Sequence, residues 1–426
     1  MSGLQWTLAA LPVALLVLGY PFFVILLAAV TLTLIFVMQL PAQLIHQNIF
    51  ASLDKYALIA IPFFVFAGDL MARGGISQRL VRWVASMVGG VRGYLPQTAL
   101  GTTVVFSAIS GSTTAAVAAV GSMTYDRLRQ AGYGERFSSG LIVSAAAIDN
   151  LIPPSVGFIL YSVASETSLL RLFTAGIVPG ILLGGTFALY IYAYAVARGE
   201  RPQRRFVPAE LIAATRDGIW SILAPVVVLG GLYAGIFSPT EAAGIACVYA
   251  LAVVGIVYRE MTWRQILESA SRTAVLTAQV FVIVAIAGVY SWILTVSGTS
   301  EAMAKAIREL NVSPAMVLLA INVFLLLIGT CIDTASAILV LTPLLVPIAI
   351  AIGVDPIHFG VILVMNLSLG TFTPPFGLNL FMAQAVFKAN LREMYLGIIP
   401  FFLVALAALQ LVTYVPWLSL WAFAKP

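Results

Sequence analysis

Runs of apolar residues about as long as a bilayer is thick constrain this chain more than any other feature. They lie near 3–19, 21–40, 55–72, 137–168, 173–197, 219–237, 240–258, 274–296, 358–387 and 395–420. A helix needs ~20 apolar residues to cross the hydrocarbon core. Only 9% of the 426 residues are charged, whereas a soluble domain carries about 25%. The sequence therefore predicts an all-α polytopic membrane protein with ten crossings, whose surroundings are the lipid bilayer.

The basic residues predict how these spans are oriented. With ten crossings, only Lys55, Arg171, Lys305, Arg308 and Lys425 of the 22 basic residues fall on one side. Because Lys and Arg accumulate in cytoplasmic loops, we expect both termini on the outer side. The basic residues are spread over short loops and form no patch for nucleic acid. Residues 1–19 lack the basic start of a cleaved signal peptide, so we expect them to remain as the first span.

Two other apolar stretches, 94–125 and 315–350, have Gly, Ser, Thr or Asp at their middle rather than at their ends. This pattern is typical of a helix that enters the membrane, turns and leaves on the same side. Irregular backbone at membrane depth must be buried in protein or line a cavity, because lipid offers it no hydrogen bonds. We therefore predict two re-entrant hairpins whose turns face a site.

The chain contains two copies of one pattern. "SGSTTAA" begins at Ser110 and "CIDTASA" begins at Cys331, which is 221 residues later. The double prolines Pro153-Pro154 and Pro374-Pro375 are separated by the same interval. Each double proline interrupts an apolar run, so we expect two broken helices, at 137–168 and 358–387.

Each copy also contains an amphipathic segment upstream of its hairpin, "GGISQRLVRWV" at 74–84 and "SGTSEAMAKAI" at 297–307. Such segments are typical of helices that lie along the membrane surface. Each copy holds five spans and one hairpin, and an odd number of crossings turns the second copy upside down. The sequence thus predicts an inverted repeat of residues 1–197 and 217–426, with the polar segment 198–216 as a cytoplasmic linker.

The double prolines predict open backbone groups in the middle of the membrane. Proline removes a backbone donor and obstructs the carbonyl four residues earlier, so a pair of prolines frees several carbonyl oxygens. Freed carbonyls can coordinate a cation, and the helix that starts after each break presents N–H groups to an anion. Ser155 and Asn379 lie close enough to these starts to add side-chain contacts.

The hairpin turns are rich in oxygen ligands. A small hard cation such as sodium prefers such ligands, although Ser and Thr in membrane helices also bond to their own backbone. A carboxylate in the membrane needs a partner, which makes Asp149 and Asp333 candidates for binding sodium or a proton. The side chains at the two turns are Ser107, Ser110, Ser112, Thr113 and Thr114 in the first, and Thr330, Asp333, Thr334 and Ser336 in the second.

Other sites have little support. His46 and His358 lie far apart without further ligands, so we expect no transition-metal site. Cys247 and Cys331 are both in apolar surroundings and predict no disulfide framework. "SPTEAAG" at 238–244 resembles the start of a helix, with Ser238 or Thr240 as its cap.

Several blocks spread over nearly the whole chain resemble one family. They are "GDLMARGGISQRL", "SAISGSTTAAVAAVGS", "IPPSVGFILY", "SPTEAAG", "DTASAILVLTPLLVPI", "GVDPIHFGVILVMNL" and "TPPFGLNLF". The chain resembles the large membrane subunit of tripartite ATP-independent periplasmic (TRAP) transporters, the family of DctM-type and sialic-acid permeases. The resemblance implies sodium-coupled uptake of an organic acid across the bacterial inner membrane by an elevator mechanism. It also implies a small DctQ-like membrane subunit and a soluble periplasmic substrate-binding protein as partners. The outer side of the orientation above is then the periplasm.

The resemblance further implies where ions and substrate bind. A first sodium site is expected where Ser107, Ser110 and Ser112 meet Asn150 and Pro153. A second is expected where Gly329, Cys331 and Asp333 meet Thr371 and Thr373. The substrate carboxylate is expected between the two turns, near Thr113, Ser155, Thr334 and Asn379.

Two alternatives belong to other classes. A stand-alone divalent-anion/sodium symporter would share the hairpins and the inversion, but it would need no soluble binding protein. An intramembrane enzyme could use Asp149 and Asp333 as a catalytic pair, but these residues are not equivalent positions of the repeat. We therefore expect a transporter rather than an enzyme.

Overall fold

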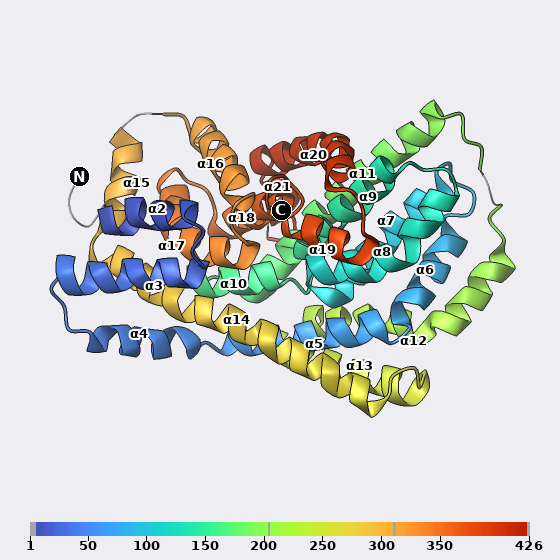
Figure 1. Cartoon of the computed structure of the whole chain (residues 1–426), viewed down its shortest axis with the longest axis horizontal. Helices are drawn as coiled ribbons and strands as arrows, with labels where there is room; N and C mark the ends of the chain where they lie inside the picture. Colours follow the sequence, from blue (N-terminus) through green and yellow to red (C-terminus); the bar gives the residue numbers. More distant parts are fainter. Residues whose placement is uncertain (1–5, 203–204, 310–311, 424–426) are drawn as a thin grey trace.

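The computed structural model describes residues 6–202, 205–309 and 312–423. Within these ranges every regular element is a helix, which confirms the all-α fold class. Residues 3–5 of the first predicted span, Arg204 and Lys425 lie outside the described residues. Figure 1 shows an elongated molecule in which helices from both halves of the chain lie side by side.

From Trp6 onward, the described part of the first half forms fourteen elements. They are η1 (Trp6–Ala10), α2 (Leu11–Val17), α3 (Phe22–Leu32), η2 (Thr33–Val37), α4 (Gln43–Leu53), η3 (Tyr56–Ile59), α5 (Ala60–Arg73), α6 (Ile76–Met87), α7 (Tyr94–Ser110), α8 (Thr113–Gln130), α9 (Glu135–Ala145), η4 (Ala146–Asn150), α10 (Val156–Ser165) and α11 (Leu169–Ala197).

The second half begins with helix α12. Its elements are α12 (Pro208–Tyr233), α13 (Pro239–Ala252), η5 (Val253–Val257), α14 (Trp263–Val296), α15 (Thr299–Glu309), α16 (Pro314–Gly329), α17 (Thr334–Ala351), α18 (Pro356–Gly370), α19 (Leu378–Phe387), α20 (Leu391–Tyr414) and α21 (Trp417–Leu420).

Seven helices of the described chain are long and apolar enough to cross a membrane. Six match predicted spans, namely Tyr56–Arg73, Leu169–Ala197, Pro208–Tyr233, Pro239–Val257, Trp263–Val296 and Leu391–Tyr414. The seventh, Thr334–Ala351, is the second arm of the hairpin expected at 315–350. The four remaining predicted spans contain shorter helices. The chain is therefore a multi-pass membrane protein, and the count of ten crossings stays a prediction.

The helices agree with the predicted hairpins, with the predicted amphipathic segments and with the spacing of the two copies. Helices α7 and α8 turn at Gly111 and Ser112, and α16 and α17 turn at residues 330–333. The amphipathic segments form α6 and α15. Helices α8 and α17 begin at Thr113 and Thr334, which are 221 residues apart. The inversion of the second copy stays a prediction.

Two elements differ from the sequence expectation. Helix α4 was not predicted, because Gln43–Leu53 mixes polar and apolar residues. It packs along α14 so closely that a Cβ atom on Gly288 would lie 1.8 Å from the Ser52 hydroxyl oxygen. Helix α14 has 34 residues and starts before the span expected at 274–296, because Thr262 and Gln265 form a capping box at its N-terminus.

The linker region also contains helix. Helix α12 begins inside the segment 198–216 that we assigned to the linker, with Pro208 in its first turn. Proline is favoured in the first turn of a helix, since the N–H group that it lacks has no partner there. The polar stretch between α11 and α12 is therefore shorter than the predicted linker.

Two groups of helices can be distinguished within the described chain. Helices α3 to α6 and α12 to α14, residues 22–87 and 208–296, pack on one another; we call them the frame. The hairpins and broken helices, α7 to α10 and α16 to α19, form a second group of residues 94–165 and 314–387, which we call the core block. Figure 1 shows α14 running obliquely along one edge of the molecule, beside α4 and α5 of the frame.

Candidate functional site

Both predicted breaks interrupt helices at the double prolines. The first lies between η4, which ends at Asn150, and α10, which begins at Val156. The second lies between α18, which ends at Gly370, and α19, which begins at Leu378. The peptide bonds Pro153-Pro154 and Pro374-Pro375 are both cis. The broken helices expected at 137–168 and 358–387 are thus present.

Ser155 closes the first break. Its hydroxyl donates a hydrogen bond to the carbonyl oxygen of Asn150 at 2.5 Å and accepts one from the backbone N–H of Phe158 at 3.3 Å. It is thereby the N-cap of α10. The side chain is fully buried, so in this conformation its oxygen serves the backbone of the break.

The turn of the first hairpin lies against the first break. Gly111 has φ +65°, and a Cβ atom there would lie 2.6 Å from the Pro154 carbonyl oxygen. Glycine is required at this position because it adopts positive φ freely and leaves room for the neighbouring backbone. The structure therefore brings Ser110 and Ser112, which flank Gly111, to the double proline.

The hydroxyls of this turn are engaged locally. Ser110 Oγ donates to the Ser112 carbonyl oxygen at 3.3 Å, and Ser107 Oγ donates to the Thr103 carbonyl oxygen at 2.8 Å. Since each hydroxyl has one proton and two lone pairs, both oxygens keep lone pairs that could bind a cation.

The second hairpin meets the second break in the same way. A Cβ atom on Gly370 would lie 2.5 Å from the Gly329 carbonyl oxygen. The hydroxyls of Thr371 and Thr373 donate to the carbonyl oxygens of Ser368 and Leu369, each at 2.6 Å. Their hydroxyl oxygens and the nearby carbonyls are thus close to the turn that contains Cys331 and Asp333.

Asp333 is the N-cap of α17. Its carboxylate accepts from the backbone N–H of Ser336 at 3.0 Å and from the Ser336 hydroxyl at 2.5 Å. Unlike Ser107 and Ser110, which are buried, Asp333 and Cys331 are exposed. The first turn is therefore enclosed by protein, whereas the second opens to the surroundings of the molecule.

Asn379 connects the two halves. Its amide nitrogen donates to Thr371 Oγ1 at 3.1 Å and to the Val143 carbonyl oxygen of α9 at 3.3 Å. The four residues expected near the substrate differ in access: Ser155 and Asn379 are fully buried, Thr113 is buried and Thr334 is half-buried.

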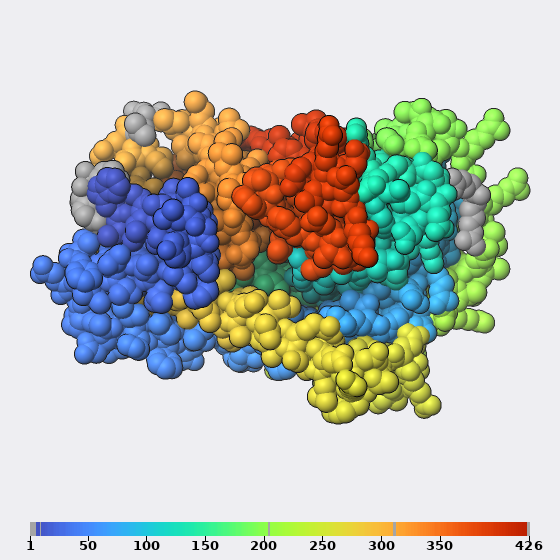
Figure 2. All heavy atoms as spheres, viewed as in Figure 1, coloured from blue at the N-terminus to red at the C-terminus, as the bar shows by residue number. Residues whose placement is uncertain are grey.

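Each half-helix after a break packs on the hairpin of the other half. Helix α10 packs against α17, and α19 packs against α8. Figure 2 shows the second contact at the surface, where the orange-red C-terminal part of the chain lies against the teal part of the first half. The two turns and two breaks therefore belong to one packed unit.

Four helices begin at these turns and breaks. Helices α8, α10, α17 and α19 follow directly after Ser112, Ser155, Asp333 and Gly377. The N-terminus of a helix carries free N–H groups and a partial positive charge, which favours a bound anion. The core block thus combines oxygen atoms suited to a cation with helix ends suited to an anion.

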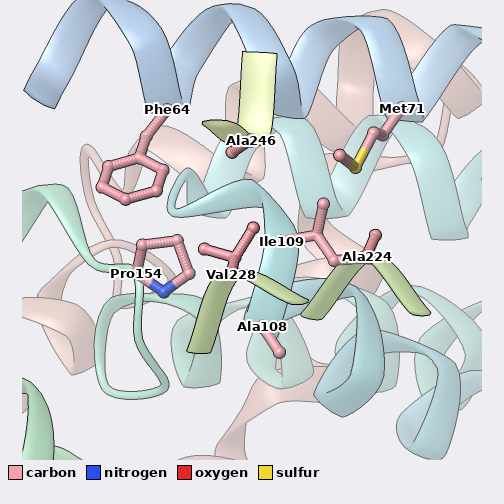
Figure 3. A pocket seen from close by; sticks show the side chains of 8 residues that line it. All are labelled: Phe64, Met71, Ala108, Ile109, Pro154, Ala224, Val228 and Ala246. Atoms are coloured by element: carbon pink, nitrogen blue, oxygen red, sulfur yellow. The ribbon is translucent and has the colours of Figure 1, made fainter. Parts of the chain in front are cut away.

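Sequence reasoning missed the contact between this region and the frame. Gly68 of α5 lies so close to the first turn that a Cβ atom there would be 2.9 Å from the Ser110 carbonyl oxygen. A small cavity beside this contact has an entirely apolar lining, shown in Figure 3: Phe64, Met71, Ala108, Ile109, Pro154, Ala224, Val228 and Ala246. Gly68 belongs to the block "GDLMARGG", but only the structure shows what it faces.

One known family matches nearly the whole chain. A family model described as "Tripartite ATP-independent periplasmic transporter, DctM component" matches residues 9–418. The C4-dicarboxylate TRAP transporter large permease protein DctM of Pseudomonas aeruginosa is 38% identical over 88% of this chain and 87% of that protein. The ectoine/5-hydroxyectoine TRAP transporter large permease protein UehC of Ruegeria pomeroyi is 36% identical over 97% of this chain and 98% of that protein.

One relative is longer than this chain. The isethionate TRAP transporter permease protein DctMQ of Oleidesulfovibrio alaskensis is 38% identical over 94% of this chain, and the match spans 63% of that protein. Among solved structures, the YdaH transporter of Alcanivorax borkumensis is similar in fold. Its TM-score is 0.69 at 17% identity, with 97% of this chain and 98% of that chain covered.

Proposed function

Because this chain belongs to the DctM family of TRAP transporter large permeases, we propose that it takes up a small organic acid across the bacterial inner membrane, driven by sodium. The observation that carries this proposal is the packing of two oxygen-rich turns against two broken helices in one unit. The names of relatives include C4-dicarboxylate, ectoine and 2,3-diketo-L-gulonate. A carboxylate or similar acid is the substrate class that we infer for this chain.

The two turn-and-break pairs are the proposed sodium sites. The first pair would use the hydroxyl oxygens of Ser107, Ser110 and Ser112 with the backbone around Asn150 and Pro153. In the second, Asp333 would act with Thr371, Thr373 and the backbone of Gly329 and Cys331. Sodium favours hard oxygen ligands, and carbonyls that lose their helical partners at a break are available for it.

The substrate would bind between the two turns. Neither the turns nor the breaks contain an arginine that could hold a carboxylate with two parallel hydrogen bonds. The four helix N-termini would therefore hold the anion, together with Thr113, Ser155, Thr334 and Asn379. Since Ser155 and Asn379 are buried in this conformation, contact with them requires the core block to rearrange.

Transport would proceed as an elevator, in which the core block moves relative to the frame. The apolar contact of the first turn with α5, α12 and α13 supports this proposal. A contact made of apolar side chains breaks no hydrogen bonds when it slides, so its energy changes little between positions. The ion pair between Lys55 and Glu166, at 3.2 Å, also joins the two groups of helices, and both side chains are exposed. An exposed pair contributes about 0–1 kcal/mol, so it would not lock them.

The family relationship also supports the proposed partners, which are a small DctQ-like membrane subunit and a soluble periplasmic binding protein. In this proposal both termini of the chain are periplasmic. A stand-alone divalent-anion/sodium symporter is the competing function. It differs in one observable property, because its uptake would not depend on an added soluble binding protein.

The test is uptake of a radiolabelled acid into proteoliposomes that contain the chain with its small subunit. The genes beside this one would identify the subunit and the binding protein. We expect uptake to require both an inward sodium gradient and the binding protein. Uptake that persists when choline replaces sodium, with no proton gradient, would refute sodium coupling. Uptake that is driven by sodium without the binding protein would support the stand-alone symporter.

A further inference from the structure

One acidic side chain of the core block has no partner. Asp149 lies in η4, directly before the first break, and its side chain is fully buried. Neither of its carboxylate oxygens has a hydrogen-bond partner in the described chain. Burial of a bare carboxylate is costly, because the protein replaces none of the interactions that the group made with water. A cation bound beside it would remove this cost.

The neighbouring hydroxyl does not supply the missing donor. Ser107 lies beside the Asp149 carboxyl group, but its hydroxyl proton points to the Thr103 carbonyl oxygen, 2.8 Å away. While the single Ser107 proton is used in that bond, it is not available to Asp149, and the Ser107 oxygen can act as a second ligand of a cation.

More oxygen atoms without donors lie in the adjoining segments. The hydroxyl oxygen of Ser144 in α9 and the amide oxygen of Asn379 in α19 are buried and have no hydrogen-bond partner in the described residues. The two segments touch, since the Asn379 amide nitrogen donates to the carbonyl oxygen of Val143, the residue before Ser144. The segments around η4 thus offer further oxygen ligands.

We propose that the Asp149 carboxylate is a ligand of a sodium ion at the first break and that Ser107 is its neighbour in that site. The proposal rests on the proposed sodium coupling and adds to it the residue that gives the first site its full negative charge. Within the first turn and the first break, residues 107–114 and 149–155, Asp149 is the only acidic residue. A carboxylate is a strong ligand for a hard cation.

This ligand would enforce coupling. With sodium bound, the site is neutral, so the core block can carry it through an apolar environment. Without sodium, the same movement would carry a bare carboxylate, which is unfavourable. Asp149 would therefore hinder inward movement of substrate without sodium, and a variant without the charge would lose that restriction.

The test is thermal unfolding of the purified full-length chain while sodium chloride replaces choline chloride at constant ionic strength. A ligand that binds only the folded protein raises Tm in a saturable manner. We expect this for the wild type and for Asp126→Asn, which makes the same chemical change at an exposed position of α8. For Asp149→Asn we expect that the sodium concentration giving half of the maximal rise in Tm is at least tenfold higher than for the wild type. In choline, its Tm should equal or exceed that of the wild type.

The outcomes separate this proposal from sodium coupling itself. A wild-type sodium response that Asp149→Asn leaves unchanged would refute the role of Asp149 and leave sodium coupling standing. No response to sodium in any variant, including the wild type, would refute sodium coupling. A third outcome is that lower pH, and not sodium, raises the Tm of the wild type but not that of Asp149→Asn. This outcome would show that the carboxyl group binds a proton, and it would overturn the proposal. If Asp149→Asn does not fold, the smaller uncharged variant Asp149→Ser gives the same prediction.

Discussion

The hydroxyl of Ser155 donates a hydrogen bond to the carbonyl oxygen of Asn150 at 2.5 Å, across the double proline that separates them. The same hydroxyl caps α10 by accepting from Phe158 N–H. One side chain thus joins the end of η4 to the start of α10. A break that loses helical hydrogen bonds is held in shape by a residue two positions after Pro153.

Replacing Ser155 with alanine should destabilise the protein by about 1–2 kcal/mol, because it removes both the bridge and the cap of a buried helix. Thermal unfolding of the purified chain measures this loss. Ser168→Ala is the matched control, since Ser168 caps α11 at an exposed position without a comparable bridge. Equal losses in the two variants would show that the bond to Asn150 contributes nothing to stability.

Gly111→Ala should abolish uptake and reduce stability. The added Cβ atom meets the Pro154 carbonyl oxygen at 2.6 Å, and the residue must also keep φ +65°. Gly298→Ala separates the two effects, because Gly298 has φ +66° but nothing within 4 Å of its Cβ position. Gly298→Ala should lower the free energy of unfolding by only about 1–2 kcal/mol, because alanine is strained in a left-handed conformation. If both variants transport equally well, the contact between turn and break is not required.

Gly68→Val should slow uptake if the core block slides on the frame, and it should also lower Tm because the added side chain meets backbone atoms. Its side chain would enter the contact between α5 and the Ser110 backbone, where a Cβ atom already lies 2.9 Å from the carbonyl oxygen. Gly230→Val in α12 is the control, because nothing lies within 4 Å of its Cβ position. Uptake assays on both variants, with Tm measured alongside, test the idea. Normal uptake by Gly68→Val would argue against movement at this contact.

Asp333→Asn and Ser112→Ala should each raise the sodium concentration needed for half-maximal uptake. Asparagine can still cap α17 through its side-chain oxygen, so Asp333→Asn removes the charge with little loss of helix stability. Ser112→Ala removes one candidate ligand oxygen from the first turn. Sodium titration of uptake measures both effects. An unaltered sodium dependence in both variants would refute the assignment of these residues.

Local features of the fold could be predicted from the sequence, because they depend on residues close together in the chain. Gly111 permits a tight turn, and the adjacent prolines at 153–154 and 374–375 interrupt their helices. Ser238 and Glu241 form the capping box expected from "SPTEAAG". The amphipathic segments at α6 and α15 were visible as a face of charges. The apolar length of the spans established the class of protein.

The packing of the helices could not be predicted in the same way. A membrane helix is apolar on every side, so its sequence pattern does not separate the face toward lipid from the face toward protein. Only the tertiary structure placed α19 against α8, α10 against α17 and Gly68 against the first turn. It also decided that Asp149 is buried with no hydrogen-bond partner among the described residues, whereas Asp333 is exposed and accepts hydrogen bonds from Ser336. The sequence by itself determined the two breaks at the double prolines, since adjacent prolines act on the local backbone. Single prolines such as Pro179 and Pro400 lie inside helices. The tertiary structure decided which broken ends meet, because that depends on side-chain shape between segments far apart in the chain.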